Sequence, residues 1–245
     1  RKILVLTGTR ADFGKLKPLM LELEKSPFIT LDVFVTGMHM LSRYGSTHEE
    51  VEKSGFSNIY KFINQNPTDT MDQALAKTIV GLSDYTRESR PDLVLFHGDR
   101  VEALAAAIVG SMNNILTGHI EGGEVSGTID ESIRHSTTKL SNLHFVANEA
   151  AQKRLIQLGE EPKQIFIIGS PDIDIMNSNN LPSIDQVKEH YEIPFDDYSL
   201  LLFHSVTTEL DSLADDVAKL VNALIQSDQN YIVVYPNNDT GTDCI

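Results

Sequence analysis

The sequence predicts an α/β fold built around a parallel sheet, and three observations carry this prediction. Short apolar runs alternate with longer segments of helical periodicity along most of the 245 residues. The runs read as near-continuous Ile, Leu, Val and Phe, which is typical of strands covered on both faces. Polar clusters directly follow several of the runs. Together these features favour right-handed βαβ units and a doubly wound, Rossmann-like sheet.

The first part of the chain alternates between expected strands and expected helices. The strands are expected at 2–7, 31–36, 92–97, 114–119, 143–147 and 164–168. The helices are expected at 13–25, 40–54, 69–88, 100–112, 130–141 and 149–158. Two of the helices are followed by residues that stop a helix, since Pro91 comes after the third and Gly159 after the last.

Domain organisation follows from a change in composition. We expect an N-terminal domain over 1–172, a linker over 173–183 that is rich in Asp, Asn, Ser and Pro, and a second domain beginning at 184. The elements expected after the linker are a helix at 184–191, a strand at 199–204, a helix at 208–227 and a strand at 231–235. Two strands and two helices are too few to close a core. Either this half packs against the first domain, or 184–245 is the start of a truncated second Rossmann-like domain, and we expect the second.

Composition excludes several classes of protein. The formal net charge of −15 argues against a nucleic-acid binder, which normally shows a basic face. No apolar run approaches the roughly 20 residues that a membrane span needs, and no signal-peptide pattern opens the chain. The single cysteine, Cys244, leaves no intrachain disulfide. A cytoplasmic protein is the expectation.

Polar residues after the expected strands should gather at one edge of the sheet, where open α/β sheets bind ligands. In the first cluster, Gly8 and Arg10 could hold an anion through backbone N–H groups and a guanidinium. The alternative is an ordinary turn with Asp12 capping the helix. The next cluster holds Asp99, which could cap a helix, orient a sugar hydroxyl or act as a base.

Two further clusters surround a glycine pair and a helix start. His119, Glu121 and Glu124 lie beside Gly122-Gly123, a pair that permits positive φ and close ligand approach. No metal-ligand pair such as His-x-x-x-His is present, so we do not expect a metal site.

A helix follows at 130–141, where Thr128 and Glu131 could form a capping box. Asp130 and Glu131 should nevertheless share a helix face with Arg134 and His135, as in an acid/base site. In the second half, His204 again follows an expected strand.

Taken in order, these motifs resemble the UDP-N-acetylglucosamine 2-epimerase family, and more closely its hydrolysing branch. The segments that carry the resemblance are Thr7–Leu16, His97–Arg100, His119–Glu124, Thr128–His135, Gly169–Pro171, His204–Glu209 and Tyr235–Asp239. The Arg-Ala-Asp and Ile-Asp-Glu-Ser-Ile-Arg-His wordings match the hydrolysing branch, because the other branch typically has Arg-Pro-Glu and Pro-Glu-Glu.

The resemblance implies a GT-B fold, in which two Rossmann-like domains enclose a UDP-sugar. It implies a cytoplasmic homodimer or tetramer without a cofactor. UDP would leave the sugar C1 as the C2 proton is removed, and water would add to the resulting glycal to give N-acetylmannosamine. The positions that match the family's catalytic residues are Asp99, Glu121, Glu131 and His204. Those that match substrate-binding positions are Gly8, Arg10, Lys15, His39, Asp130, Arg134, His135 and Asn238.

Three alternatives stay open at this point. The substrate could be UDP-2,4-diacetamido-2,4,6-trideoxyglucose, which carries one more acetamido group than UDP-N-acetylglucosamine. The shape of the pocket would decide between the two. A GT-B glycosyltransferase would share the fold, but it would leave three carboxylates at separate strand ends without a purpose. The short second half also allows a non-catalytic sugar-nucleotide binding module.

Overall fold

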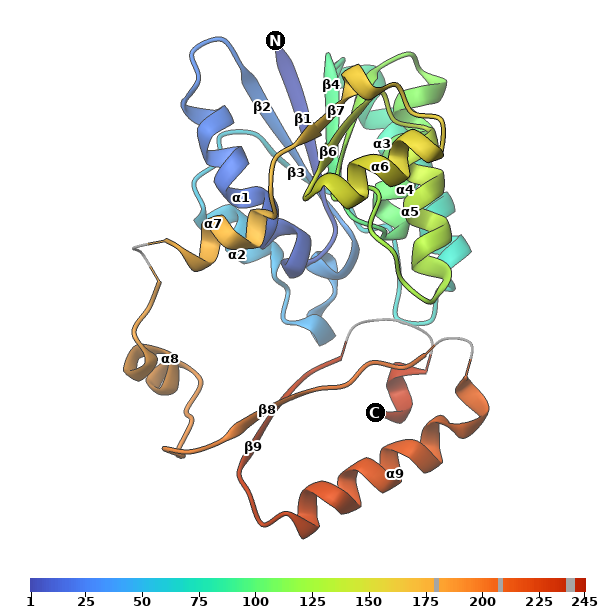
Figure 1. Ribbon diagram of the computed structural model, residues 1–245. Helices are drawn as coiled ribbons and strands as arrows, with labels where there is room; N and C mark the ends of the chain where they lie inside the picture. Colours follow the sequence, from blue (N-terminus) through green and yellow to red (C-terminus); the bar gives the residue numbers. More distant parts are fainter. Residues whose placement is uncertain (179–180, 207–208, 237–240) are drawn as a thin grey trace. The chain divides into compact units, whose positions relative to one another are not determined.

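Seven parallel strands form the sheet in this computed structural model, which describes residues 1–178, 181–206, 209–236 and 241–245 (Figure 1). The strand order is β3-β2-β1-β4-β5-β6-β7. In chain order the strands are β1 (Lys2–Thr7), β2 (Thr30–Val35), β3 (Ile59–Lys61), β4 (Leu93–His97), β5 (Leu116–Ile120), β6 (Leu143–Val146) and β7 (Ile165–Ile167). The predicted doubly wound α/β class is confirmed, and the order reverses between β1 and β4, where such sheets bind ligands.

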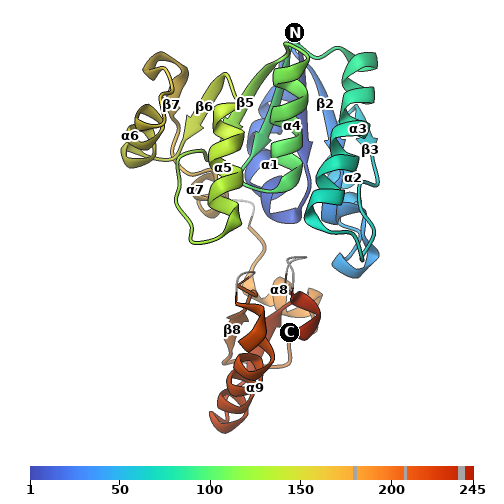
Figure 2. The ribbon, with the colours of Figure 1, turned by 90° about the vertical axis from the view of Figure 1, so that its right-hand side faces the viewer.

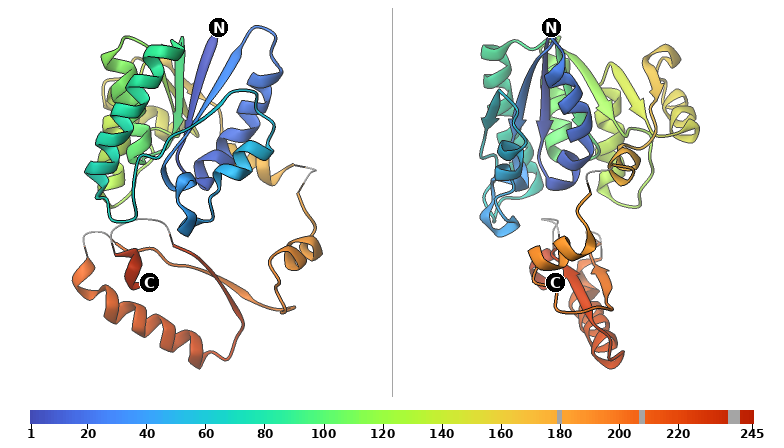
Figure 3. Two further views of the ribbon diagram at one scale, coloured as in Figure 1. Left: turned by 180° about the vertical axis from the view of Figure 1, so that it is seen from behind. Right: turned by 90° about the vertical axis from the view of Figure 1, so that its left-hand side faces the viewer.

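Helices cover both faces of the sheet (Figures 2 and 3). The helices of this unit are α1 (Arg10–Lys25), α2 (His48–Lys53), α3 (Met71–Ser89), α4 (Val101–Met112), α5 (Ile129–Lys139), α6 (Glu149–Gln157) and α7 (Pro171–Met176). Short 3-10 turns lie at Gly37–Met40, Ser42–Tyr44 and Pro162–Gln164.

The core splits into two layers because side chains alternate along each strand. Val5 of β1 packs with Phe13 and Leu16 of α1 on one face, while Leu4 packs with Phe96 and the α4 alanines on the other. Leu4 and Val5 are both fully buried. This burial on both faces explains why the strands read as unbroken apolar runs.

Three elements differ from the expected ones. The helix expected at 40–54 is wrong over its first half, because Gly45 and Ser46 adopt positive φ and leave only α2. Strand β3 was not expected, since three residues at a sheet edge carry little apolar signal. Helix α7 occupies the start of the segment expected as linker, and it packs against α1.

A second compact unit spans Asn179–Ile245, after a first unit that ends at Ser178. Its elements are α8 (Ile184–His190), β8 (Ser199–Leu202), α9 (Leu210–Gln226), β9 (Tyr231–Val234) and a 3-10 turn at Thr242–Cys244. Strands β8 and β9 pair in parallel. Leu213 is its one buried hydrophobic side chain among the residues described, so this unit has little core of its own. In the described part of the chain, no helix is both long enough and apolar enough to span a bilayer.

Candidate active site

A pocket of about 330 Å³ opens at the carboxyl ends of β1, β4 and β5, within the first unit. It is lined by Thr9, Ala11, Asp12, Lys15, His97, Gly98, Asp99, Arg100, Glu121, Glu124 and Arg134. The polar clusters that follow three separate strands therefore meet in one place. Of the expected site residues, Lys15, Asp99, Glu121 and Arg134 line it directly.

Glu121 is held between two nitrogen groups. Lys15 Nζ donates to Glu121 Oε2 at 2.9 Å, and His97 Nε2 lies 2.6 Å from the same oxygen. Burial alone would raise the pKa of Glu121, but His97 and Lys15 outweigh it and lower that pKa to about 2. Glu121 also has φ of +66°, an uncommon conformation for a residue with a side chain. This carboxylate stays ionised at neutral pH.

Asp99 occupies a different corner of the pocket. Its Oδ2 accepts a hydrogen bond from Arg134, which also donates to the Glu124 carbonyl at 3.2 Å. Burial raises the pKa of Asp99 above its usual value, although Arg134 opposes the shift. The nearby Asp130 charge adds to the increase. Asp99 is thus closer than Glu121 to the pKa range in which a carboxyl group exchanges protons at neutral pH.

The turn after β1 is closed by its own side chains. Thr9 caps α1, and Asp12 at the third helical position completes a capping box. The Asp12 carboxylate accepts hydrogen bonds from Gly8 N at 3.0 Å and Thr9 N at 3.2 Å. These two amides are therefore already occupied, and the expected anion cradle at Gly8 is revised. Arg10 lies exposed at the first position of α1.

His39 is fully buried and does not line the pocket, so its expected substrate contact is not seen in this structure. The Thr7 hydroxyl donates to Asp12, and His39 Nε2 lies 3.0 Å from the same hydroxyl. The Thr47 hydroxyl lies 2.7 Å from Nδ1. These contacts assign the proton to Nε2, with Nδ1 as acceptor. Burial lowers the pKa of His39, which favours the neutral ring.

Glu102 of α4 is buried directly beneath the same turn. Asn64 Nδ2 donates to its Oε1 at 3.4 Å. A Cβ on Gly8 would come within 3.1 Å of Glu102 Cγ, so the side chain fills the space that a larger residue at Gly8 would need. Burial raises the pKa of Glu102, which favours the protonated carboxyl group. Burial thus favours the neutral forms of both Glu102 and His39.

The glycine pair after β5 serves the packing of the protein. Gly123 has φ of +81°, and a Cβ there would lie 2.7 Å from the Ala151 carbonyl oxygen of α6. The close approach that requires glycine here is to this helix. His119 is fully buried, with Nε2 2.8 Å from the Gly98 carbonyl and Nδ1 3.1 Å from the Thr138 hydroxyl. Burial lowers its pKa to about 3, so it braces the turn beside Asp99 as a neutral ring.

Helix α5 carries the remaining expected residues of the first unit. Thr128 caps it by accepting from Asp130 N, and Asp130 Oδ2 in turn accepts from the Thr128 hydroxyl at 2.9 Å. Glu131 accepts a hydrogen bond from Ser126 N at 2.9 Å, so it closes the preceding loop instead of forming the expected capping box. His135 Nε2 lies 3.7 Å from Glu131 Oε1. Asp130, Glu131 and His135 do not line the pocket.

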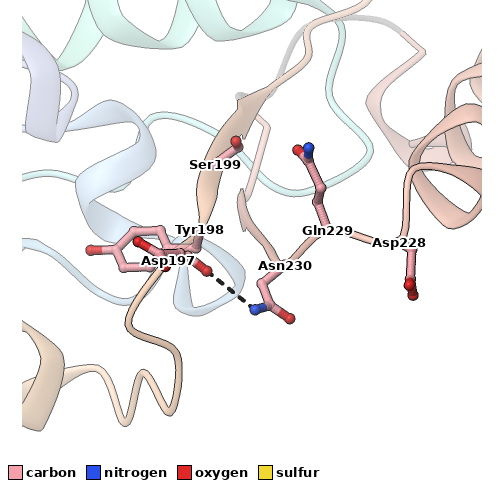
Figure 4. Close-up of a pocket in the computed structure, with 6 residues that line it drawn as sticks. All are labelled: Asp197, Tyr198, Ser199, Asp228, Gln229 and Asn230. Carbon is pink, nitrogen blue, oxygen red and sulfur yellow. Dashed lines mark hydrogen bonds between the residues drawn. The ribbon is translucent and has the colours of Figure 1, made fainter.

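The other expected residues belong to the second unit. His204 is exposed, two residues after β8 ends. Asn238 lies outside the described residues. A polar hollow of about 440 Å³ forms at the amino ends of β8 and β9, where Asn230 Nδ2 donates to the Asp197 carbonyl at 3.1 Å (Figure 4). An apolar hollow of about 410 Å³ lies between these strands and α9. Among the residues that the structure describes, no expected site residue lines either hollow.

Seven lining residues were absent from the expected set, and four of them have ionisable side chains: Asp12, His97, Arg100 and Glu124. His97 had a sequence signal, since it precedes Gly98-Asp99 at the end of an apolar run. Asp12 and Glu124 also stand inside the recognised motifs. Their side-chain directions depend on tertiary contacts and could not be read from spacing.

Comparisons with known proteins agree with this architecture. The profile described as UDP-N-acetylglucosamine 2-epimerase matches residues 21–245. A UDP-N-acetylglucosamine 2-epimerase of Neisseria meningitidis serogroup B is 51% identical over the whole chain. The UDP-N,N'-diacetylbacillosamine 2-epimerase (hydrolyzing) of Legionella pneumophila is 38% identical over 98% of it. The chain spans 65% of the length of each of these relatives.

A solved structure extends the likeness to the fold. The UDP-GlcNAc 2-epimerase of Methanocaldococcus jannaschii, in complex with UDP-GlcNAc and UDP, superposes with a TM-score of 0.79 at 23% identity. The match covers 99% of this chain and 67% of that one. The fold is therefore of the GT-B-like type expected from the sequence.

Proposed function

We propose a catalytic function on the premise that the chain belongs to the UDP-N-acetylglucosamine 2-epimerase family. The proposed reaction is hydrolysing 2-epimerisation, in which UDP-N-acetylglucosamine and water give UDP and N-acetylmannosamine. A role in the synthesis of sialic-type acids follows from that product. The observation that carries the proposal is the convergence of Lys15, His97, Asp99, Glu121 and Arg134 on one pocket at the switch of strand order.

The proposed chemistry proceeds in two halves. In the first, the bond from C1 to the diphosphate oxygen breaks, and its electron pair leaves with UDP. A carboxylate takes the C2 proton, and the C–H electron pair forms the C1–C2 double bond of the glycal. In the second, water adds its oxygen to C1 and a proton returns to C2 from the opposite face. The C2 proton becomes acidic only as C1 gains positive character, so a carboxylate is a sufficient base.

The surroundings of the two carboxylates suggest separate roles. Divergent environments often separate a proton-transferring group from a charge-stabilising one. We assign proton transfer to Asp99, whose pKa is raised by burial. We assign stabilisation of the developing cation at C1 to Glu121, which stays ionised between Lys15 and His97. Arg10 and His204 would meet the departing diphosphate, and Glu131 would shape the loop beside Asp99.

Product analysis with isotopes tests this proposal. The full-length protein is incubated with UDP-N-acetylglucosamine in D₂O and, separately, in H₂¹⁸O. We expect N-acetylmannosamine with one deuterium at C2, and UDP free of ¹⁸O because the C1–O bond breaks. A glycosyltransferase would require an acceptor and would not invert C2. A binding module would leave the substrate intact, and either result would overturn the proposal.

The diacetamido sugar nucleotide is a second candidate substrate, since the 38% identical relative is described as acting on diacetylbacillosamine. The higher identity of 51% to a UDP-N-acetylglucosamine 2-epimerase favours that substrate. Competition between the two nucleotides gives the ratio of their kcat/KM values. If the ratio favours the diacetamido compound, that compound becomes the proposed substrate, and the proposed reaction class is unchanged.

We also propose that the protein works as a cytoplasmic homodimer or tetramer. We propose a UDP-sugar as the molecule that this protein binds. The related epimerase whose structure was solved with UDP-GlcNAc and UDP supports this choice. Native mass spectrometry of the full-length protein would measure the oligomeric state. Calorimetry with UDP would measure how much of the nucleotide site this chain contains.

A further inference from the structure

The ammonium group of Lys15 contacts a second carboxylate outside the pocket lining. Lys15 Nζ lies 3.4 Å from Asp172 Oδ2, on the first turn of α7. The same nitrogen donates to Glu121 at 2.9 and 3.3 Å. The ammonium group is therefore shared between the end of β5 and the start of α7, which packs against α1 (Figure 1).

The ion pairs of Lys15 with Glu121 and with Asp172 are less exposed to solvent than ordinary surface ion pairs. The Lys15 and Glu121 side chains are each only 22% exposed, and Asp172 is 41% exposed. Screening by water is weaker for such partly buried groups than for exposed pairs. The two carboxylates raise the pKa of Lys15 despite the opposing effect of burial. Lys15 consequently stays charged and has two fixed anchors.

Asp174 on the same helix provides a built-in comparison. It stands one residue beyond Ile173 and is exposed. No ion pair involving Asp174 is found among the described residues. Neutralising Asp174 therefore changes the charge of α7 by the same amount as neutralising Asp172, but it leaves the Lys15 contact intact.

We propose that Asp172 is a positioning residue that holds the Lys15 ammonium group on Glu121. The inference rests on the proposed function, in which Glu121 stabilises the developing cation. Helix α7 is the last helix before the first unit ends at Ser178. Asp172 thereby ties the geometry of a catalytic carboxylate to the segment that leads into the second unit. A shift of α7 would change the position of Lys15 and, through it, that of Glu121.

The expected effect is on turnover more than on substrate binding. Without Asp172 the lysine side chain loses one of its two anchors, and Glu121 is held less firmly. A misplacement of 1 Å can cost about 10²-fold in rate. We expect Asp172→Asn to lower kcat about tenfold, because Lys15 keeps its contact with Glu121. KM should change little, since Asp172 itself does not line the pocket.

A double-mutant cycle on the full-length protein tests the positioning role. Asp172→Asn, Asp174→Asn and Lys15→Met are measured alone, and each aspartate variant is also combined with Lys15→Met. We expect Asp172→Asn to have little further effect once Lys15 is replaced, and Asp174→Asn to remain near wild type in both backgrounds. An equal loss from Asp172→Asn with and without Lys15 would overturn the proposal, as would an equal loss from Asp174→Asn.

A titration without substrate separates this inference from the proposed function. The side-chain amine of Lys15 is followed by NMR in the wild type and in the two aspartate variants. Removing the Asp172 charge should lower the pKa of Lys15, and removing the Asp174 charge should leave it unchanged. An unchanged pKa in Asp172→Asn would refute the contact itself. If the pKa falls but no variant or wild-type protein processes UDP-sugars, the proposed function fails and the role of Asp172 in catalysis fails with it.

Discussion

Asp99 and Glu121 line the same pocket, yet their surroundings act on them in opposite directions. Glu121 lies between Lys15 and His97, and its pKa falls to about 2. Asp99 meets Arg134, but burial and the charge of Asp130 raise its pKa. Two carboxylates of similar chemistry are thus set apart by their neighbours alone. The difference teaches that one pocket can hold a fixed negative charge beside a group that is better suited to moving protons.

Replacing Asp99 should produce the largest effect on activity. Asn cannot transfer the C2 proton, and general acid–base steps are worth about 10²–10⁴-fold in rate. We expect Asp99→Asn to lower kcat by that factor, measured as the initial rate of N-acetylmannosamine release. Asp84→Asn, on the exposed side of α3, is the matched control and should stay at the wild-type rate. Turnover within threefold of wild type would assign proton transfer to another residue.

Replacing Glu121 should have a large but smaller effect. Gln keeps the shape but removes the charge that faces C1, and it leaves Lys15 and His97 without their counter-charge. We expect Glu121→Gln to lower kcat about 10²-fold, at the lower end of the range for such groups. The same product assay measures it. A near wild-type rate would remove Glu121 from the mechanism and erase the contrast with Asp99.

The two carboxyl groups should change the stability of the fold with pH in opposite directions. The folded-state pKa of Glu121 is depressed from 4.5 to about 2. Its ionisation therefore stabilises the fold above the unfolded pKa, and this stabilisation is lost as pH falls through that window. We expect a contribution of about 3 kcal/mol, which Glu121→Gln would remove.

The pKa of Asp99 is raised in the folded state, so its stabilising contribution is present at low pH and is lost as pH rises through the folded pKa. Asp99→Asn should accordingly be no less stable than the wild type at neutral pH. Urea unfolding at a series of pH values measures both differences. Parallel curves for the two variants would contradict the opposite shifts.

Arg134 offers the smallest change and the finest test. Its guanidinium favours the ionised form of Asp99, so Arg134→Met should raise the Asp99 pKa further. We expect the acidic limb of the kcat/KM profile to move to higher pH by about one unit. Arg134→Lys keeps a positive charge and should move the limb less. A shift to lower pH would show that another group controls the limb.

The strands of the fold were predictable because both of their faces are buried. Leu4 and Val5 are buried on opposite faces of the sheet, so both must be apolar. An unbroken apolar run in the sequence is the result. Strand β3 carries no such record, because Tyr60 and Lys61 lie at an exposed edge. The segment after β2 has helix-like apolar spacing, but the positive φ of Gly45 and Ser46 divides it.

The location of the site could be predicted from the sequence, but most contacts between its side chains could not. Asp99 and Glu121 could be predicted because they directly follow apolar strands that share one edge. The ion pair of Lys15 with Glu121 joins residues 106 positions apart, a separation that periodicity does not encode. His39 also follows a strand, yet its ring points into the protein and not into the pocket. The direction of a side chain at a strand end is decided by packing.

The space shared by Glu102, Gly8 and Gly37 restricts the order in which these positions can evolve. An added Cβ would lie 3.1 Å from Glu102 Cγ at Gly8 and 2.8 Å from Glu102 Oε1 at Gly37. Alanine at position 8 would require the Glu102 side chain to move by a few tenths of an ångström. A smaller residue at position 102 would ease that substitution, and a return to glutamate would be easier with glycine in place. This coupling predicts that the residues at 8 and 102 vary together among descendants of a common ancestor.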